Sequence, residues 1–260
     1  MESEIILETH DLRKEFGGLV AVADVNMKVK SNSLHSIIGP NGAGKTTLFN
    51  LLSSNLQPTS GRVVYKGRDI TDIPAYRSAH LGIGRSFQIT NIFQNLTVLE
   101  NVRLSAQAVG KDSYKFWQHY KHFKKYEDRA WQVIDLIGLI EQASLPASML
   151  PHGGKRKLEI AIILAADPEL LLLDEPTAGM AREEIPLLME TINQIRNQEN
   201  KTIMLVEHKM DLVMNVSDRI TVMHQGAVIA EGTPAEISSN EIVQAAYLGE
   251  LYGNLSEVQQ

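Results

Sequence analysis

The sequence predicts an α/β fold with a mostly parallel central sheet, an antiparallel β region near the N-terminus and a helical lobe. Three observations support the two β regions, and helical spacing of apolar residues within 98–140 supports the lobe. A glycine-rich segment, 39–47, stands between a predicted strand, 34–38, and a helix-forming run. The runs 170–173 and 203–206 are apolar throughout, as strands buried on both faces of a parallel sheet are. Residues 5–30 instead alternate apolar and polar positions, which is typical of antiparallel strands with one solvated face.

Composition narrows the class of protein. A chain of 260 residues is long enough for one large domain, or for one domain with a small lobe. The net charge of −6, from 25 basic and 31 acidic side chains, gives no support for nucleic-acid binding. The absence of cysteine excludes disulfides, thiolate catalysis and cysteine–zinc sites. No apolar run approaches the roughly 18 residues of a membrane span, so work at a membrane would need a partner that holds the chain there.

Segment 39–47, GPNGAGKTT, fits the phosphate-loop template G-x-x-x-x-G-K-[ST]. Its glycines let successive backbone N–H groups point at phosphate oxygens, and the following helix N-terminus adds partial positive charge. Lys45 supplies a charge for the β- and γ-phosphates, and the Thr46 hydroxyl can bind Mg²⁺. A strand at 34–38 and a helix at 46–52 provide the required context, which favours this interpretation over a simple glycine-rich turn. The residues expected around the phosphates are Gly39, Pro40, Asn41, Gly42, Ala43, Gly44, Lys45, Thr46 and Thr47.

Polar side chains follow two of the predicted buried strands. Asp174 and Glu175 come directly after the leucine run, and His208 follows strand 202–206. Open α/β sheets hold ligands at the carboxyl ends of their strands, so these side chains are expected near the phosphates. The alternative for the acidic pair is a helix cap. A convincing phosphate loop earlier in the chain favours the functional interpretation.

Three further features of the sequence each allow more than one interpretation. Phe16, in a turn before the phosphate loop, suits stacking on a purine and a place in the core equally well. Gln88 follows a short predicted strand and is by default a surface residue. Residues 114–129 are basic and aromatic, and an amphipathic helix with a solvated basic face is favoured over contact with nucleic acid or membrane headgroups. A helix is predicted from Lys155, and short strands at 62–67, 219–223 and 227–231.

Together these pieces resemble the nucleotide-binding subunit of ABC transporters, a P-loop NTPase, from about residue 5 to residue 251. The resemblance implies one ATPase domain, 1–251, with a helical lobe at about 89–165 and a tail at 252–260. It implies ATP and Mg²⁺ as cofactors. The implied roles are adenine stacking for Phe16, Mg²⁺ contacts for Thr46, Gln88 and Asp174, catalysis for Glu175, and a γ-phosphate contact for His208.

Two segments depart from the family pattern. The signature segment, ordinarily Leu-Ser-Gly-Gly-Gln, is Leu-Pro-His-Gly-Gly at 150–154. Pro151 has neither a hydroxyl nor an N–H group, whereas Gly153 and the following helix N-terminus could still bind a phosphate. The aspartate usual in the loop after Glu175 is also absent, and Ala181 lies in the segment that replaces it. These changes bear on hydrolysis rate and dimer closure more than on the class of function.

The segments 16–22, 158–160, 207–210 and 246–250 look like the importer branch for branched-chain and other neutral amino acids. This likeness implies a head-to-tail homo- or heterodimer with a second ATP-binding subunit, transmembrane permease subunits, an indirect solute-binding protein and a peripheral location on the cytoplasmic face of the inner (plasma) membrane. The alternatives are an ABC ATPase for another cargo such as urea or lipopolysaccharide, a soluble ABC protein of translation or repair, and a module that binds ATP without hydrolysing it.

Overall fold

The computed structural model describes residues 4–86, 92–110 and 124–246. The chain divides into two compact units, one formed by residues 1–78, 172–175 and 202–260, the other by residues 79–171 and 176–201. Gln88, residues 114–123 and the tail 252–260 lie outside the described residues.

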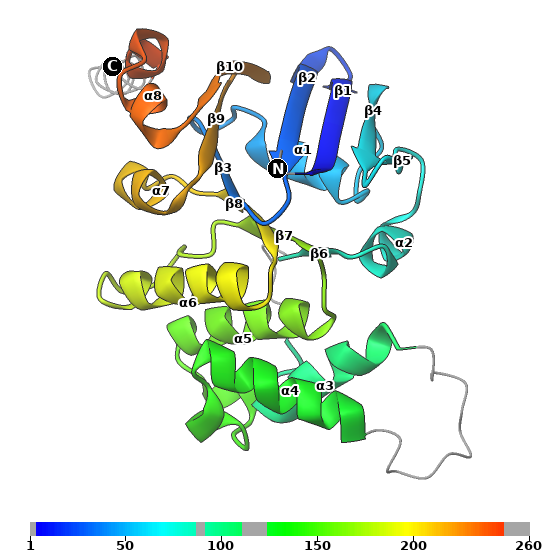
Figure 1. The fold of residues 1–260 in the computed structure, drawn as a ribbon, viewed down its shortest axis with the longest axis vertical. Coiled ribbons are helices and arrows are strands. Elements are labelled where there is room, and N and C mark those ends of the chain that lie inside the picture. The colour runs from blue at the N-terminus through cyan, green and yellow to red at the C-terminus, as the bar shows by residue number, and fades with distance from the viewer. Residues whose placement is uncertain (1–3, 87–91, 111–123, 247–260) are drawn as a thin grey trace. The chain divides into compact units, whose positions relative to one another are not determined.

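The first unit is built on two sheets (Figure 1). One is antiparallel, with the strand order β2-β1-β4-β5. The other has the order β10-β9-β3-β8-β7-β6, in which β3 pairs in parallel with β8 and β9; its last strand β6 and the first residues of β7 belong to the second unit. The predicted antiparallel region and the mostly parallel sheet are both confirmed. The elements are β1 (Ile5–Phe16), β2 (Leu19–Lys30), β3 (Leu34–Ile38), α1 (Lys45–Leu52), β4 (Ser60–Tyr65), β5 (Arg68–Asp69), β7 (Leu170–Asp174), β8 (Thr202–Val206), α7 (Met210–Val216), β9 (Arg219–His224), β10 (Ala227–Gly232) and α8 (Pro234–Ser238).

Strand β3 is central to this sheet, and all five of its residues are buried. Leu34 stands opposite Ile203 of β8, and His35 stands opposite Arg219 of β9. The parallel arrangement brings the carboxyl ends of β3, β7 and β8 to one edge of the sheet. The phosphate loop, Glu175 and His208 each follow one of these three strand ends.

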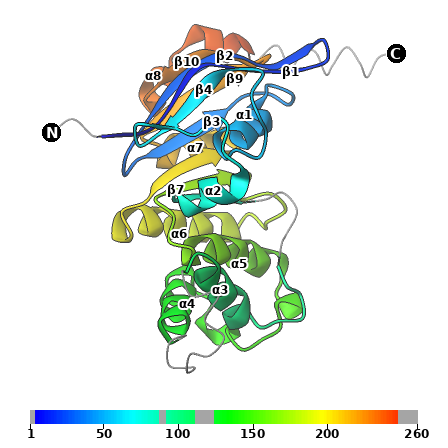
Figure 2. The ribbon, with the colours of Figure 1, turned by 90° about the vertical axis from the view of Figure 1, so that its right-hand side faces the viewer.

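The second unit is mainly helical (Figure 2). Helix α5 packs against α3 and α4, and α4 also contacts α6. Thr97 caps α3, because its side chain accepts a hydrogen bond from the amide of Glu100. The elements are α2 (Ala75–His80), which continues from the first unit, β6 (Ile83–Arg85), α3 (Val98–Ala108), α4 (Lys124–Ile137), η2 (Ile140–Gln142), η3 (Ala147–Met149), α5 (His152–Ala165) and α6 (Glu184–Gln198).

Helix α5 begins at His152, so the predicted start at Lys155 is wrong. Pro151 is the N-cap residue, with φ −64° and ψ 169°, and offers no side-chain acceptor. Gly153 and Gly154 then form part of the first turn rather than a break before it. The amides of a first turn have no intrahelical partner, so proline at its edge removes no hydrogen bond of the helix.

His35 gives the first unit a predicted acid sensitivity. It is buried in β3 and its Nε2 atom lies 2.7 Å from Thr221 Oγ1. Burial, and then the positive charge of Arg219, lower the pKa of His35 from 6.5 to about 4. Between these values the unfolded chain binds a proton that the native chain does not. The free energy of unfolding therefore falls as the pH drops from 6.5 towards 4, by about 3 kcal/mol in total.

The measurement is urea unfolding of the wild-type protein and of His35→Gln between pH 7.5 and pH 4.5. We expect the unfolding free energy of the wild type to fall relative to that of His35→Gln as the pH drops, because glutamine does not titrate. His80→Gln, at an exposed position, controls for loss of one imidazole and should follow the wild type. A constant difference between His35→Gln and wild type across this range would contradict the prediction.

Candidate functional site

The phosphate loop connects β3 to α1 and is shaped by its glycines. Gly44 is the N-cap of α1, with φ 97° and no side-chain cap. A Cβ atom at Gly44 would lie 2.2 Å from the carbonyl oxygen of Ala21 on β2, so no other residue fits there without moving the backbone. The loop is also tied to the turn after β9, because the amide of Gly226 donates to the carbonyl of Ala43 at 3.1 Å. These contacts fix the backbone of the loop at the N-terminus of α1.

Lys45 is the buried cation of this loop, with only 6% of its surface exposed. Its Nζ atom donates hydrogen bonds to the carbonyl oxygens of Gly39 at 2.6 Å and Pro40 at 2.8 Å. These bonds curl the loop around its own ammonium group. The positive charge is thus positioned at the start of α1, where a helix N-terminus also favours anions.

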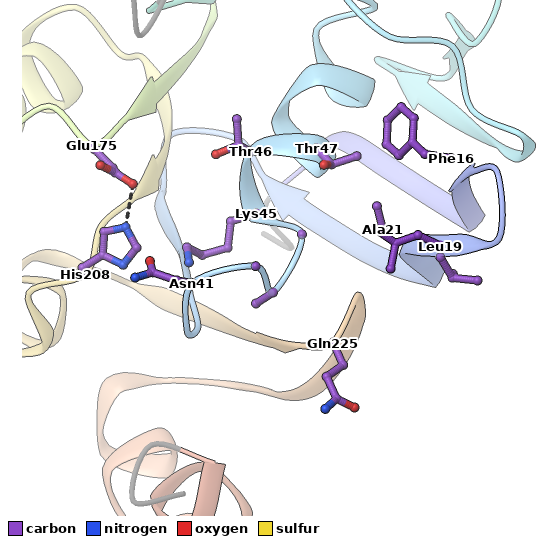
Figure 3. A pocket seen from close by; sticks show the side chains of 14 residues that line it. Phe16, Leu19, Ala21, Asn41, Lys45, Thr46, Thr47, Glu175, His208 and Gln225 are labelled. Atoms are coloured by element: carbon purple, nitrogen blue, oxygen red, sulfur yellow. Dashed lines mark hydrogen bonds and ion pairs between the residues drawn. The ribbon is translucent and has the colours of Figure 1, made fainter. Parts of the chain in front are cut away.

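Glu175 and His208 meet although they follow different strands. Glu175 comes directly after β7 with φ 47°, a left-handed backbone conformation that is uncommon outside glycine. Its amide donates to the carbonyl of Val206, the last residue of β8, at 2.9 Å. The Nε2 atom of His208 lies 2.5 Å from Glu175 Oε1 (Figure 3). Both side chains remain partly exposed, so an imidazole and a carboxylate face solvent as one pair.

A pocket of about 680 Å³ brings these groups together. In Figure 3, Glu175 and His208 lie at one end and Phe16 at the other, with Lys45 and its loop between them. Phe16 is 48% exposed, so it is not a core aromatic, and Lys14 Nζ lies 5.2 Å from its ring centroid. The lining residues are Phe16, Leu19, Val20, Ala21, Asn41, Gly42, Ala43, Gly44, Lys45, Thr46, Thr47, Glu175, His208 and Gln225. An exposed aromatic ring, a positively charged loop and an acid–base pair, placed in this order along the pocket, are suited to binding a nucleoside polyphosphate.

The family described as "ABC transporter" matches residues 22–178, more than half of the chain. The chain belongs to the ABC transporter family. It is therefore an ATPase of the ATP-binding cassette type. A second family, described as "Branched-chain amino acid ATP-binding cassette transporter", matches residues 227–252.

Individual relatives of this ABC ATPase cover almost its whole length. The "High-affinity branched-chain amino acid transport ATP-binding protein LivG" of Salmonella typhimurium is 41% identical over 95% of this chain and 99% of its own. The "Lipopolysaccharide export system ATP-binding protein LptB" of Haemophilus influenzae is 31% identical over 95% and 98%. A crystal structure of an ATP-binding cassette of an ABC transporter, in its ADP conformation, superposes with a TM-score of 0.83 at 29% identity, covering 95% of this chain and all of that one.

Oxygen ligands for a metal are present in the ABC ATPase. The Thr46 hydroxyl belongs to the pocket lining, and Asp174 is buried at the end of β7 with 2% of its surface exposed. Hydroxyl and carboxylate oxygens are the hard donors that Mg²⁺ prefers, usually together with substrate phosphates. Within the described residues, no group of three or more His, Cys, Asp or Glu side chains could hold a metal by itself. The residues present fit a Mg²⁺ ion that is shared with a nucleotide.

The signature segment lies in the second unit. Pro151, Gly153 and Gly154 line a separate pocket of about 170 Å³ at the start of α5. Gly153 is buried, whereas Pro151 and His152 are exposed. The N-terminus of α5 is thus present as expected, without the hydroxyl that the family pattern carries there.

Four lining residues were not predicted. Leu19, Val20 and Ala21 belong to β2, and Gln225 belongs to the turn between β9 and β10. Their sequence signal is weak, because apolar strand residues and a turn glutamine occur in any fold. They reach the pocket only because the phosphate loop packs on β2 and on the turn at Gly226. Among the described helices, none is long and apolar enough to cross a membrane.

Proposed function

We propose that this ABC ATPase is the ATP-hydrolysing subunit of an importer for branched-chain or other neutral amino acids. The observation that carries ATP hydrolysis is that Lys45 and the Glu175–His208 pair line one and the same pocket at the phosphate loop. The amino-acid cargo is supported by 41% identity to a branched-chain amino acid transport protein, against 31% to a lipopolysaccharide export protein.

The residues divide the work by their chemistry. The exposed ring of Phe16 stacks on adenine, while Lys45 and the loop amides bind the β- and γ-phosphates. Glu175 polarises the attacking water, and His208, bonded to Glu175, orients that water or contacts the γ-phosphate. Phosphoryl transfer depends mainly on such positioning and on charge neutralisation.

We assign the Mg²⁺ site to Thr46 and Asp174, with Gln88 as a third ligand by family likeness. When bound, Mg²⁺ would neutralise part of the negative charge of the phosphates. Asp174, at the end of β7, and Thr46, in the first turn of α1, would hold this ion on the protein side.

The proposed assembly is a dimer, because the phosphate loop and the signature segment are proposed to act on the same ATP from two different chains. The signature segment of one chain and the phosphate loop of another are proposed to enclose ATP in a head-to-tail dimer, homomeric or heteromeric. The dimer is proposed to attach to transmembrane permease subunits on the cytoplasmic face of the inner membrane, and through them to serve a solute-binding protein. ATP binding closes the dimer and hydrolysis opens it, since the γ-phosphate contacts exist only before hydrolysis.

Uptake of radiolabelled leucine by cells tests the cargo. Cells that lack this chain are expected to lose most of their ATP-dependent leucine uptake, because a permease without its ATPase has no energy source. Wild-type protein should restore uptake, and Glu175→Gln should not. Unchanged leucine uptake, with an active purified ATPase, would refute the amino-acid cargo and leave ATP hydrolysis standing. Loss of urea uptake or of lipopolysaccharide export instead would reassign the cargo.

A further inference from the structure

The first turn of α5 and the start of α6 touch within the second unit, and Gly153 makes this contact possible. A Cβ atom at Gly153 would lie 2.4 Å from Glu184 Oε1 and 2.8 Å from Glu184 Oε2. The Glu184 carboxylate therefore packs directly on the backbone of the signature segment. Any residue other than glycine at position 153 would displace it.

A second contact joins the same two segments in the opposite direction. A Cβ atom at Gly179 would lie 2.8 Å from Cε1 of His152, the first residue of α5. Gly179 also has φ 73°, which favours glycine. Each segment thus contributes one glycine and one polar side chain, so that Glu184 packs on Gly153 and His152 packs on Gly179.

Glu184 also closes the turn that begins α6. The amide of Ala181 donates a hydrogen bond to Glu184 Oε2 at 3.2 Å. The alanine side chain at 181 cannot make such a bond itself, and the family pattern has an aspartate in this loop. One carboxylate, half-buried, therefore contacts both the loop 176–183 and the first turn of α5.

We propose that Glu184 is a positioning residue for ATP hydrolysis. This inference rests on the proposed roles of Glu175 and of the signature segment. Loop 176–183 continues directly from Glu175 along the chain, and Glu184 fixes its far end against Gly153. The Glu184 carboxylate therefore connects two segments. One is the loop that follows Glu175, and the other is the signature segment, which is proposed to contact the ATP bound by the second chain. Misplacing catalytic groups by about 1 Å can cost on the order of 10²-fold in rate, so partial loosening should be visible in kcat.

The test compares ATP turnover by the full chain, over a range of ATP and protein concentrations, for Glu184→Ala, Glu184→Gln and Glu183→Ala. We expect Glu184→Ala to lower kcat roughly 10-fold with KM for ATP changed less than about 2-fold, because Glu184 lines the pocket of the signature segment and not the pocket that contains Phe16 and Lys45. Glu184→Gln keeps the size of the side chain and an acceptor for the Ala181 amide, so it should keep at least about one third of kcat. Glu183 is the exposed neighbour, without a side-chain cap bond, and serves as the matched control.

A double-mutant cycle with Gly153→Ala separates positioning from unrelated damage. Gly153→Ala alone should lower kcat, because its methyl group displaces the Glu184 carboxylate. In the double variant Gly153→Ala with Glu184→Ala, the second substitution should cause no further loss of kcat, since the effects of residues in contact are not additive. Wild-type kcat in Glu184→Ala, or a double variant whose loss equals the product of the two single losses, would overturn the proposal.

Two further measurements make each outcome interpretable. Binding of a fluorescent ATP analogue and the melting temperature report folding, and a loss of nucleotide binding in Glu184→Ala would also overturn a positioning role. Glu175→Gln in the same assay tests the proposed function by itself. Normal turnover by Glu175→Gln would refute the role of Glu175, whereas the effect of Glu184→Ala is measured in chains that retain Glu175.

Discussion

Replacing Glu175 by glutamine is expected to slow ATP hydrolysis by roughly 10²- to 10⁴-fold while ATP still binds. Glutamine has nearly the same size but cannot accept a proton from the attacking water. It can still bond to His208, whose Nε2 atom lies 2.5 Å from the carboxylate of Glu175, so the geometry of the pair should survive. The measurement is phosphate release under saturating ATP, together with equilibrium binding of a fluorescent ATP analogue.

Glu169→Gln is the matched control for this variant. Glu169 is an exposed glutamate directly before β7, at the opposite end of the strand from Glu175. We expect its phosphate release to stay within about 2-fold of wild type, because exposed substitutions away from a site change little. Full activity in Glu175→Gln would remove Glu175 from the catalytic role, and weak analogue binding would mean that the pocket itself had changed.

Lys45→Ala is expected to weaken ATP binding by roughly 10- to 100-fold and to abolish measurable hydrolysis. Hydrogen bonds to charged groups contribute about 1.5–3 kcal/mol each, which corresponds to this range of affinity. The buried ammonium also holds the carbonyl oxygens of Gly39 and Pro40, so its removal loosens the loop as well. Titration calorimetry with ATP measures the affinity directly.

Two variants define what position 45 requires. Lys45→Arg keeps the charge, but a planar guanidinium differs in shape from the compact ammonium that lies 2.6 Å and 2.8 Å from two loop carbonyls, so it should not restore hydrolysis. Lys28→Ala removes an exposed lysine of β2 that does not line the pocket, and should bind ATP as the wild type does. Wild-type affinity in Lys45→Ala would contradict the assignment of the phosphate loop.

Much of the sheet could be predicted because its signals are local. Strands β7 and β8 are mostly apolar, as buried parallel strands are, and β3 is marked by the phosphate loop that follows it. The meeting of Glu175 with His208 could be predicted in outline, since the carboxyl ends of neighbouring parallel strands share one edge. Their direct bond and the positive φ of Glu175 could not, because both depend on how β7 and β8 are placed side by side.

Other features escaped prediction for identifiable reasons. The start of α5 was placed too late because glycine pairs usually interrupt helices, whereas here they lie in a first turn. Helix α6 was not predicted, although Ile185, Leu188 and Ile192 have helical spacing, because Pro186 and the polar residues around it obscure the pattern. The lining residues of β2 and Gln225 depend on contacts between segments distant in sequence, which no local pattern encodes.

The position of β3 between β8 and β9 has a consequence for synthesis of the chain. The amide of Asn32, just before β3, donates a hydrogen bond to the Thr202 hydroxyl oxygen, 170 residues further along the chain. At about 5–20 residues per second, the ribosome needs roughly 10–35 s to make the intervening segment. Throughout that interval β3 has neither of its neighbours. The nascent phosphate loop therefore has no completed sheet beneath it until the last quarter of the protein emerges, and nucleotide binding can begin only near the end of translation.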